Sequence, residues 1–217
     1  MKNLLIASTA FALCIGTAHA QATTTVDSTE FTLVPNAAFL ECLSADGTTP
    51  PVAKVFVRRG NLNDTLAIRV TGLKPNLQFD LFTVQRSPFL ADGSKDPSFP
   101  GTFGLAWYQS DLDADDNGKA EIKVPLRSIF LDQIFGFDGD KNPDGSAILP
   151  PVNTYHVGFW FNNPADAAPC GFNVATPTPF NGEHNAGPLA MISLPVAATN
   201  LGPLCVSPEQ GTPCNPQ

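Results

Sequence analysis

The stretch that decides the fold class is TLAIRVT, residues 65–71. Leu66, Ile68 and Val70 alternate with small or polar residues, so they share one face of an extended chain. A period of two is typical of an antiparallel strand with one buried and one solvated face. The stretch therefore predicts a half-buried β-strand and favours an all-β chain.

Six further segments carry β-branched and aromatic residues between turn residues and are expected to be strands: 52–58, 78–85, 103–109, 119–125, 155–161 and 189–194. Seven or more short strands indicate an antiparallel β-sandwich, here one domain over residues 21–217. One helical turn is expected to begin near Ser128. Residues 86–101 and 162–188 are rich in Pro, Gly and Asn and are expected to be long loops. Residues 162–217 then form a loop-rich, disulfide-closed C-terminal part.

A local resemblance supports this architecture. The segment VTGLKPNLQF, residues 70–79, resembles the turn before the sixth strand of fibronectin type III modules. That family has a Leu-x-Pro-x-x-x-Tyr pattern in which the tyrosine hydroxyl locks the corner. Leu73 and Pro75 match the pattern, but the aromatic residue is Phe79, so only its packing role carries over. The resemblance implies an immunoglobulin-like or fibronectin-like sandwich and implies no activity.

The first twenty residues have the pattern of a signal peptide. Lys2 precedes an apolar run over residues 4–16 that is too short to span a bilayer, and Ala18-His19-Ala20 forms a small-x-small cleavage site. Cleavage after Ala20 would give a secreted or periplasmic protein without a transmembrane anchor. The whole chain carries a formal net charge of −8 and has no basic run, so nucleic acid is not an expected partner.

Four cysteines remain after such a cleavage, which is an even number in an oxidising compartment. Cys205 and Cys214 flank a short turn-rich loop, so we expect them to pair, and Cys42 would then pair with Cys170. The sequence alone allows three connectivities.

Two acidic loops have the spacing of calcium-binding loops. The first holds Asp113, Asp115, Asn117 and then Gly118, as in D-x-[DN]-x-[DN]-G, with Glu121 at the ninth position. The twelfth position is a valine, which excludes an EF-hand. Because Asn-Gly between two strands is also a hairpin signal, a plain turn is the alternative.

The second loop repeats the spacing with Asp140, Asn142 and Asp144. Calcium is therefore the one cofactor that the sequence suggests, as a structural ion. A turn-rich surface loop is again the alternative.

Candidate catalytic residues are few. Beyond residue 20, the chain has only two histidines, His156 and His184, and together with Glu183 they could form a metal-assisted catalytic site. No H-x-H, H-E-x-x-H, G-x-S-x-G or S-x-x-K motif is present. The sequence thus contains no recognisable catalytic constellation.

The segment 155–161 also suggests a ligand site. One face carries core residues, whereas the other carries His156, Gly158, Trp160 and then Asn162. An aromatic plate, a hydrogen-bonding ring and an amide are what a shallow sugar or peptide site uses. Alternatively, Gly158 admits a neighbouring backbone and Trp160 lies under the long loop.

The hypothesis from the sequence is an exported, non-catalytic binding or interaction module for an unknown protein or glycan ligand. One alternative is a metal-assisted extracytoplasmic enzyme that uses His156 and His184. A second alternative is a structural surface or matrix protein.

Overall fold

The structure is a computed structural model that describes residues 28–58, 60, 63–126, 136–142, 144–147, 155–178 and 184–205. In these residues it contains nine strands: β1 (Ser28–Pro35), β2 (Val52–Arg58), β3 (Asp64–Thr71), β4 (Gln78–Val84), β5 (Leu105–Asp113), β6 (Ala120–Leu126), β7 (Gly136–Asp138), β8 (His156–Phe161) and β9 (Leu189–Ser193). All seven expected strands are confirmed within a few residues at their ends. The sequence reading missed β1 and β7.

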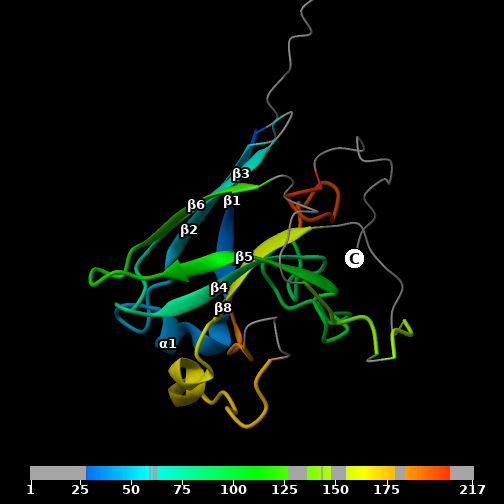
Figure 1. Cartoon of the computed structure of the whole chain (residues 1–217). Helices are drawn as coiled ribbons and strands as arrows, with labels where there is room; N and C mark the ends of the chain where they lie inside the picture. The colour runs from blue at the N-terminus through cyan, green and yellow to red at the C-terminus, as the bar shows by residue number, and fades with distance from the viewer. Residues whose placement is uncertain are drawn as a thin grey trace, which may run out of the picture.

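The nine strands form one sheet, in the order β6-β3-β2-β1-β9-β8-β4-β5-β7, with every neighbouring pair antiparallel. β5 and β6 lie near opposite ends of this order, yet the short link 114–119 joins them. The sheet must therefore roll round until its two ends approach, and Figure 1 shows β5 and β6 diverging from their shared turn. The antiparallel all-β class is confirmed. The two separate sheets of a sandwich are not confirmed, because one continuous and nearly closed sheet takes their place.

The main core fills the inside of the roll. Leu66, Ile68 and Val70 of β3 are at most 1% exposed, as their alternation predicts. Phe79 of β4 packs against Phe159 of β8 with ring centroids 4.9 Å apart. Each such side chain contributes about 1.5–3 kcal/mol by leaving water, so this cluster stabilises the rolled sheet.

Short helices and a disulfide close one end of the roll. The helices are η1 (Ala37–Phe39), α1 (Leu40–Leu43) and η2 (Pro164–Cys170). Cys42 of α1 is bonded to Cys170 of η2, which confirms this predicted pair. Cys205 is also disulfide-bonded, whereas Cys214 lies outside the described residues, so the pairing of these two stays a prediction.

The turn that resembles fibronectin type III modules links β3 to β4. Leu73 is fully buried there and donates its N–H to the carbonyl oxygen of Gly118. Phe79 is fully buried, so its expected packing role is confirmed. An immunoglobulin-like arrangement of strands is not confirmed.

Two expectations from the sequence lie outside the described residues: the signal peptide over residues 1–20 and the helical turn near Ser128. Within the described ranges, no helix has the length and apolar character needed to cross a membrane.

Candidate functional site

A second apolar cluster lies on the outer face of the sheet, over β4, β8 and β9. It contains Phe82 and Val84 from β4, Trp160 from β8 and Ile192 from β9. Every residue of β8 is buried, so this strand is covered on both faces. The cover comes from loop residues such as Phe89, because a second sheet is absent from the described part of the chain.

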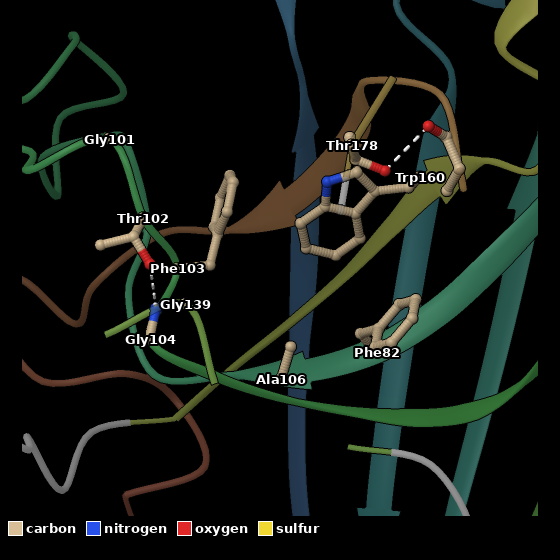
Figure 2. A pocket seen from close by; sticks show the side chains of 10 residues that line it. Phe82, Gly101, Thr102, Phe103, Gly104, Ala106, Gly139, Trp160 and Thr178 are labelled. Carbon is tan, nitrogen blue, oxygen red and sulfur yellow. Dashed lines mark hydrogen bonds between the residues drawn. The ribbon is translucent and has the colours of Figure 1, made fainter. Parts of the chain in front are cut away.

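This cover leaves a pocket of about 360 Å³ beside Trp160 (Figure 2). One side of the pocket is the segment 101–104 together with Gly139, and the other is Thr178 with Ala186. Ala106 lies between the two sides. The volume is at the lower end of the range for small-molecule sites, about 300–1,000 Å³.

Three aromatic rings line the pocket, and two of them, Phe103 and Phe82, stand nearly perpendicular to the third, Trp160. Trp160 and Phe103 have ring centroids 5.0 Å apart and planes at 85°. Trp160 and Phe82 are 5.5 Å apart at 83°. Figure 2 shows the broad face of Trp160 with Phe103 upright beside it. Phe103 and Phe82 therefore each pack edge to face with Trp160, and Trp160 and Phe82 are only 7% and 6% exposed.

A buried ion pair lies beneath the glycine side of the pocket. Arg86 and Asp140 are paired, and each side chain is only 6% exposed. Thr102 donates its hydroxyl to Asp140 at 3.3 Å and accepts the N–H of Gly104 at 3.2 Å. A Cβ on Gly104 would lie 2.8 Å from a guanidinium nitrogen of Arg86. The Arg86–Asp140 pair thus lies directly against the wall formed by residues 101–104. The opposite charges of the two side chains neutralise each other.

The opposite wall is a short ladder between two loop segments. Thr178 donates its hydroxyl to the carbonyl oxygen of Ala186 at 2.8 Å, and Asn185 donates its side-chain amide to the carbonyl oxygen of Thr178 at 2.9 Å. Gly187 holds this ladder on the sheet, because its N–H donates to the carbonyl oxygen of Phe161 and a Cβ would lie 2.9 Å from that residue.

His184 lies at the start of this wall and contacts a buried carboxylate. Its Nε2 is 3.0 Å from Oδ2 of Asp80, whose side chain is fully buried. The Oδ1 of Asp80 accepts the side-chain amide of Asn162 at 2.9 Å. Burial raises the pKa of Asp80, against the opposing effect of these hydrogen bonds. In the register of β4 and β8, Asp80 lies opposite Trp160, so this group adjoins the pocket.

The structure does not bring the two candidate histidines together. His156 of β8 lies opposite Val84 of β4, whereas His184 contacts Asp80 of β4. Val84 and Asp80 are four residues apart in the strand, which corresponds to about 13 Å. The Nδ1 of His156 is 3.1 Å from both the carbonyl oxygen and the hydroxyl oxygen of Ser193. Burial lowers the pKa of His156 to about 4. Glu183 lies outside the described residues, and within those residues no three His, Cys, Asp or Glu side chains are grouped to hold a metal.

The first acidic loop is a hairpin turn stabilised by its own side chains. Asp115 Oδ1 accepts the N–H groups of Asn117 and Lys119 at 2.9 and 2.8 Å. Glu121 forms an ion pair with Arg69 of strand β3, with the nitrogen and oxygen atoms 2.8 Å apart. Asp113 is an exposed residue at the end of β5.

In the second acidic loop two of the predicted ligands share Ser146 as a partner, and the third faces a different side chain. Asp140 faces Arg86 in the buried ion pair. Asp144 accepts the N–H and the hydroxyl of Ser146 at 2.9 and 2.6 Å, and Asn142 donates to the same hydroxyl oxygen at 3.0 Å. Calcium binding at either loop stays a prediction.

Of the predicted ligand-binding residues, Trp160 lines the pocket, Asn162 binds Asp80, and His156 lies buried against Ser193. The alternative interpretation, in which Gly158 admits a neighbouring backbone, is confirmed, because a Cβ there would lie 3.0 Å from the carbonyl oxygen of Met191.

The sequence reading missed Phe82, Phe103 and the three pocket glycines, Gly101, Gly104 and Gly139. The expected strand 103–109 begins at Phe103, whereas β5 begins two residues later and Phe103 belongs to the loop. The close spacing of Gly101 and Gly104 around Phe103 was the signal that could have indicated a loop at this position.

Comparisons with known proteins identify no relative of this chain: no family model, no curated protein and no solved structure matches it.

Proposed function

We propose that this chain is an exported, non-catalytic binding module and that its ligand site is the pocket beside Trp160. The observation that carries the proposal is the composition of the walls: three aromatic rings and three glycines around about 360 Å³, with no charged side chain among those lining residues that the structure describes. Such a pocket can hold a small apolar group by burying it against the apolar side chains of its walls.

The surroundings of the pocket favour binding over chemistry. The nearest ionisable groups are engaged in structural contacts, Arg86 with Asp140 and His184 with Asp80. Both wall hydroxyls, on Thr102 and Thr178, already donate hydrogen bonds within the protein. A wall whose hydroxyls are engaged within the protein is suited to selecting a ligand by shape.

Export after a signal peptide and calcium bracing of the acidic loops are parts of the proposal that rest on the sequence. Thermal unfolding of the purified chain in chelator and across a calcium series tests the calcium part. A midpoint that rises with calcium, and no longer rises in Asp113→Ala or Asp140→Ala, would support an ion in the corresponding loop.

Tryptophan fluorescence tests the pocket, because the chain has only two tryptophans. In Trp107→Phe the emission comes from Trp160 alone, and in the matched Trp160→Phe it comes from Trp107 alone. We titrate each variant with benzyl alcohol, benzylamine and benzoate. A saturable change in Trp107→Phe that is missing in Trp160→Phe supports the site. No change with any compound, or equal changes in both variants, contradicts it.

A further inference from the structure

The indole nitrogen of Trp160 gives the pocket a hydrogen-bond donor. We propose, on the basis of the proposed function, that the pocket binds a small neutral molecule through an oxygen acceptor, which takes the indole N–H of Trp160. The oxygen of a ketone, ester, ether or amide meets this requirement. Two observations lead to this ligand class: the state of the indole N–H and the chemistry of the other walls.

The indole N–H is an unused donor in a well-packed wall. Trp160 is only 7% exposed, and Phe103 and Phe82 pack against its ring. Within the described part of the chain its Nε1 donates no hydrogen bond, and Figure 2 shows none from it. The indole nitrogen can only donate, and a buried one usually has a partner. The position therefore suits an acceptor that comes from outside the protein.

This donor is open to the pocket. Among the described residues, the side-chain polar atoms that are fully enclosed without a partner are Gln109 Oε1 and His156 Nε2. The indole nitrogen is not one of them, so it keeps contact with solvent. Figure 2 shows it on the edge of the ring nearest Thr178, which lines the same pocket. A ligand that fills the pocket covers this N–H, and it leaves the N–H unpaired unless it supplies an acceptor.

The other walls define the rest of the ligand. Apart from two threonines, the described lining residues are glycines, alanines and aromatic residues, so most of the ligand surface must be apolar. A carboxylate could also accept the indole N–H. It would lose its hydration without meeting a cationic side chain among the described lining residues. A neutral oxygen satisfies the donor with a smaller loss of hydration.

The indole signals in a proton–nitrogen correlation spectrum test the inference. The chain has two tryptophans, and the spectrum of Trp107→Phe identifies the signal of Trp160. We titrate the full chain with cyclohexanone and with methylenecyclohexane, which has the same shape and a CH₂ group in place of the oxygen. Hydrogen bonding deshields an N–H proton, so at saturation the Trp160 signal should lie further downfield with the ketone. Cyclohexanecarboxylate, the charged probe, should bind at least about tenfold more weakly than the ketone.

Removing the N–H alone separates the hydrogen bond from the shape of the ring. In Trp107→Phe the remaining tryptophan is Trp160, so expression with β-(3-benzothienyl)alanine replaces the N–H by sulfur at this position only. We expect the affinity for cyclohexanone, measured by calorimetry, to fall about three- to tenfold, because one hydrogen bond is lost. The affinity for methylenecyclohexane should not fall. A thermal melt checks that the sulfur-containing chain is folded; if it is not, the indole signals of the full chain decide.

The outcomes distinguish the two proposals. If both probes bind and the Trp160 signals at saturation coincide, the inference is wrong and the binding site stands. The same holds if the folded sulfur-containing chain binds cyclohexanone as tightly as its parent. If the carboxylate binds as tightly as the ketone, the neutral ligand class is wrong. If no probe shifts the Trp160 signal and the benzyl compounds leave its fluorescence unchanged, both proposals fail.

Discussion

The buried histidine of β8 makes the stability of the protein depend on pH. His156 is fully buried, its Nδ1 contacts the backbone and hydroxyl oxygens of Ser193, and its Nε2 has no hydrogen-bond partner in the described structure. Burial lowers its pKa from 6.5 to about 4. The folded protein therefore favours the neutral ring, and the unfolded chain binds a proton more readily.

The sign and size of the effect follow from this difference. A depressed histidine pKa contributes stability that is fully present above the unfolded pKa and is lost as the pH falls toward the folded pKa. From 6.5 and about 4, the loss is about 2 kcal/mol by pH 5 and about 3 kcal/mol by pH 4. Asp80 acts in the opposite direction, because its raised pKa gives stability at low pH that is lost as the pH rises.

The assay is guanidinium unfolding of the wild-type chain and of His156→Asn, with disulfides intact, from about pH 7.5 to about pH 4. Asparagine keeps a donor near Ser193 and does not titrate, and the effect of Asp80 cancels because both chains contain it. We expect the wild type to lose about 2–3 kcal/mol more than the variant over this range. His184→Asn should retain the wild-type loss. An equal loss in the wild type and His156→Asn would refute the reasoning.

Three further outcomes are expected. The Cys42–Cys170 bridge has a sequence separation of 128, so replacing both cysteines by serine should lower the free energy of unfolding by up to about 5 kcal/mol, as measured by guanidinium unfolding without reductant. Arg86→Met leaves the buried carboxylate of Asp140 without its cation and should destabilise the fold by about 3–5 kcal/mol, whereas adding Asp140→Leu should recover most of the loss. Gly104→Ala should lower the melting temperature and weaken ligand binding, because the residue has φ +73° and its Cβ would press on Arg86; unchanged values in both assays would contradict this account.

The strands could be predicted because a period of two fixes which side chains face the core. The alternation of Leu66, Ile68 and Val70 is matched by their complete burial on the inner face. β1 was missed because Phe31 and Leu33 are the only large apolar residues in its alternating part, so its period of two is short in the sequence. The continuity of the sheet could not be predicted, since pairing between β1 and β9, in the middle of the strand order, joins segments more than 150 residues apart and leaves no local signal.

The site was only partly predictable for a similar reason. Trp160 was identified because it shares a face with Gly158 within one strand. Phe103 and Gly139 come from other segments of the chain, and no periodicity relates them to Trp160. The ion pair of Arg86 with Asp140 joins residues 54 positions apart, and the acidic spacing around Asp140 indicated calcium instead of a guanidinium partner.

The location of the pocket follows from how β8 is covered. A strand that is apolar on both faces requires a cover on each side. In a sandwich a second sheet would supply the outer cover and interdigitate with the rings. Here loops supply it, and the segment that faces Trp160 contains Gly101 and Gly104, which have no side chains to fill the space. The pocket therefore lies where the outer face has large rings and its cover has small residues, and the buried pair beneath Gly104 keeps that wall in place.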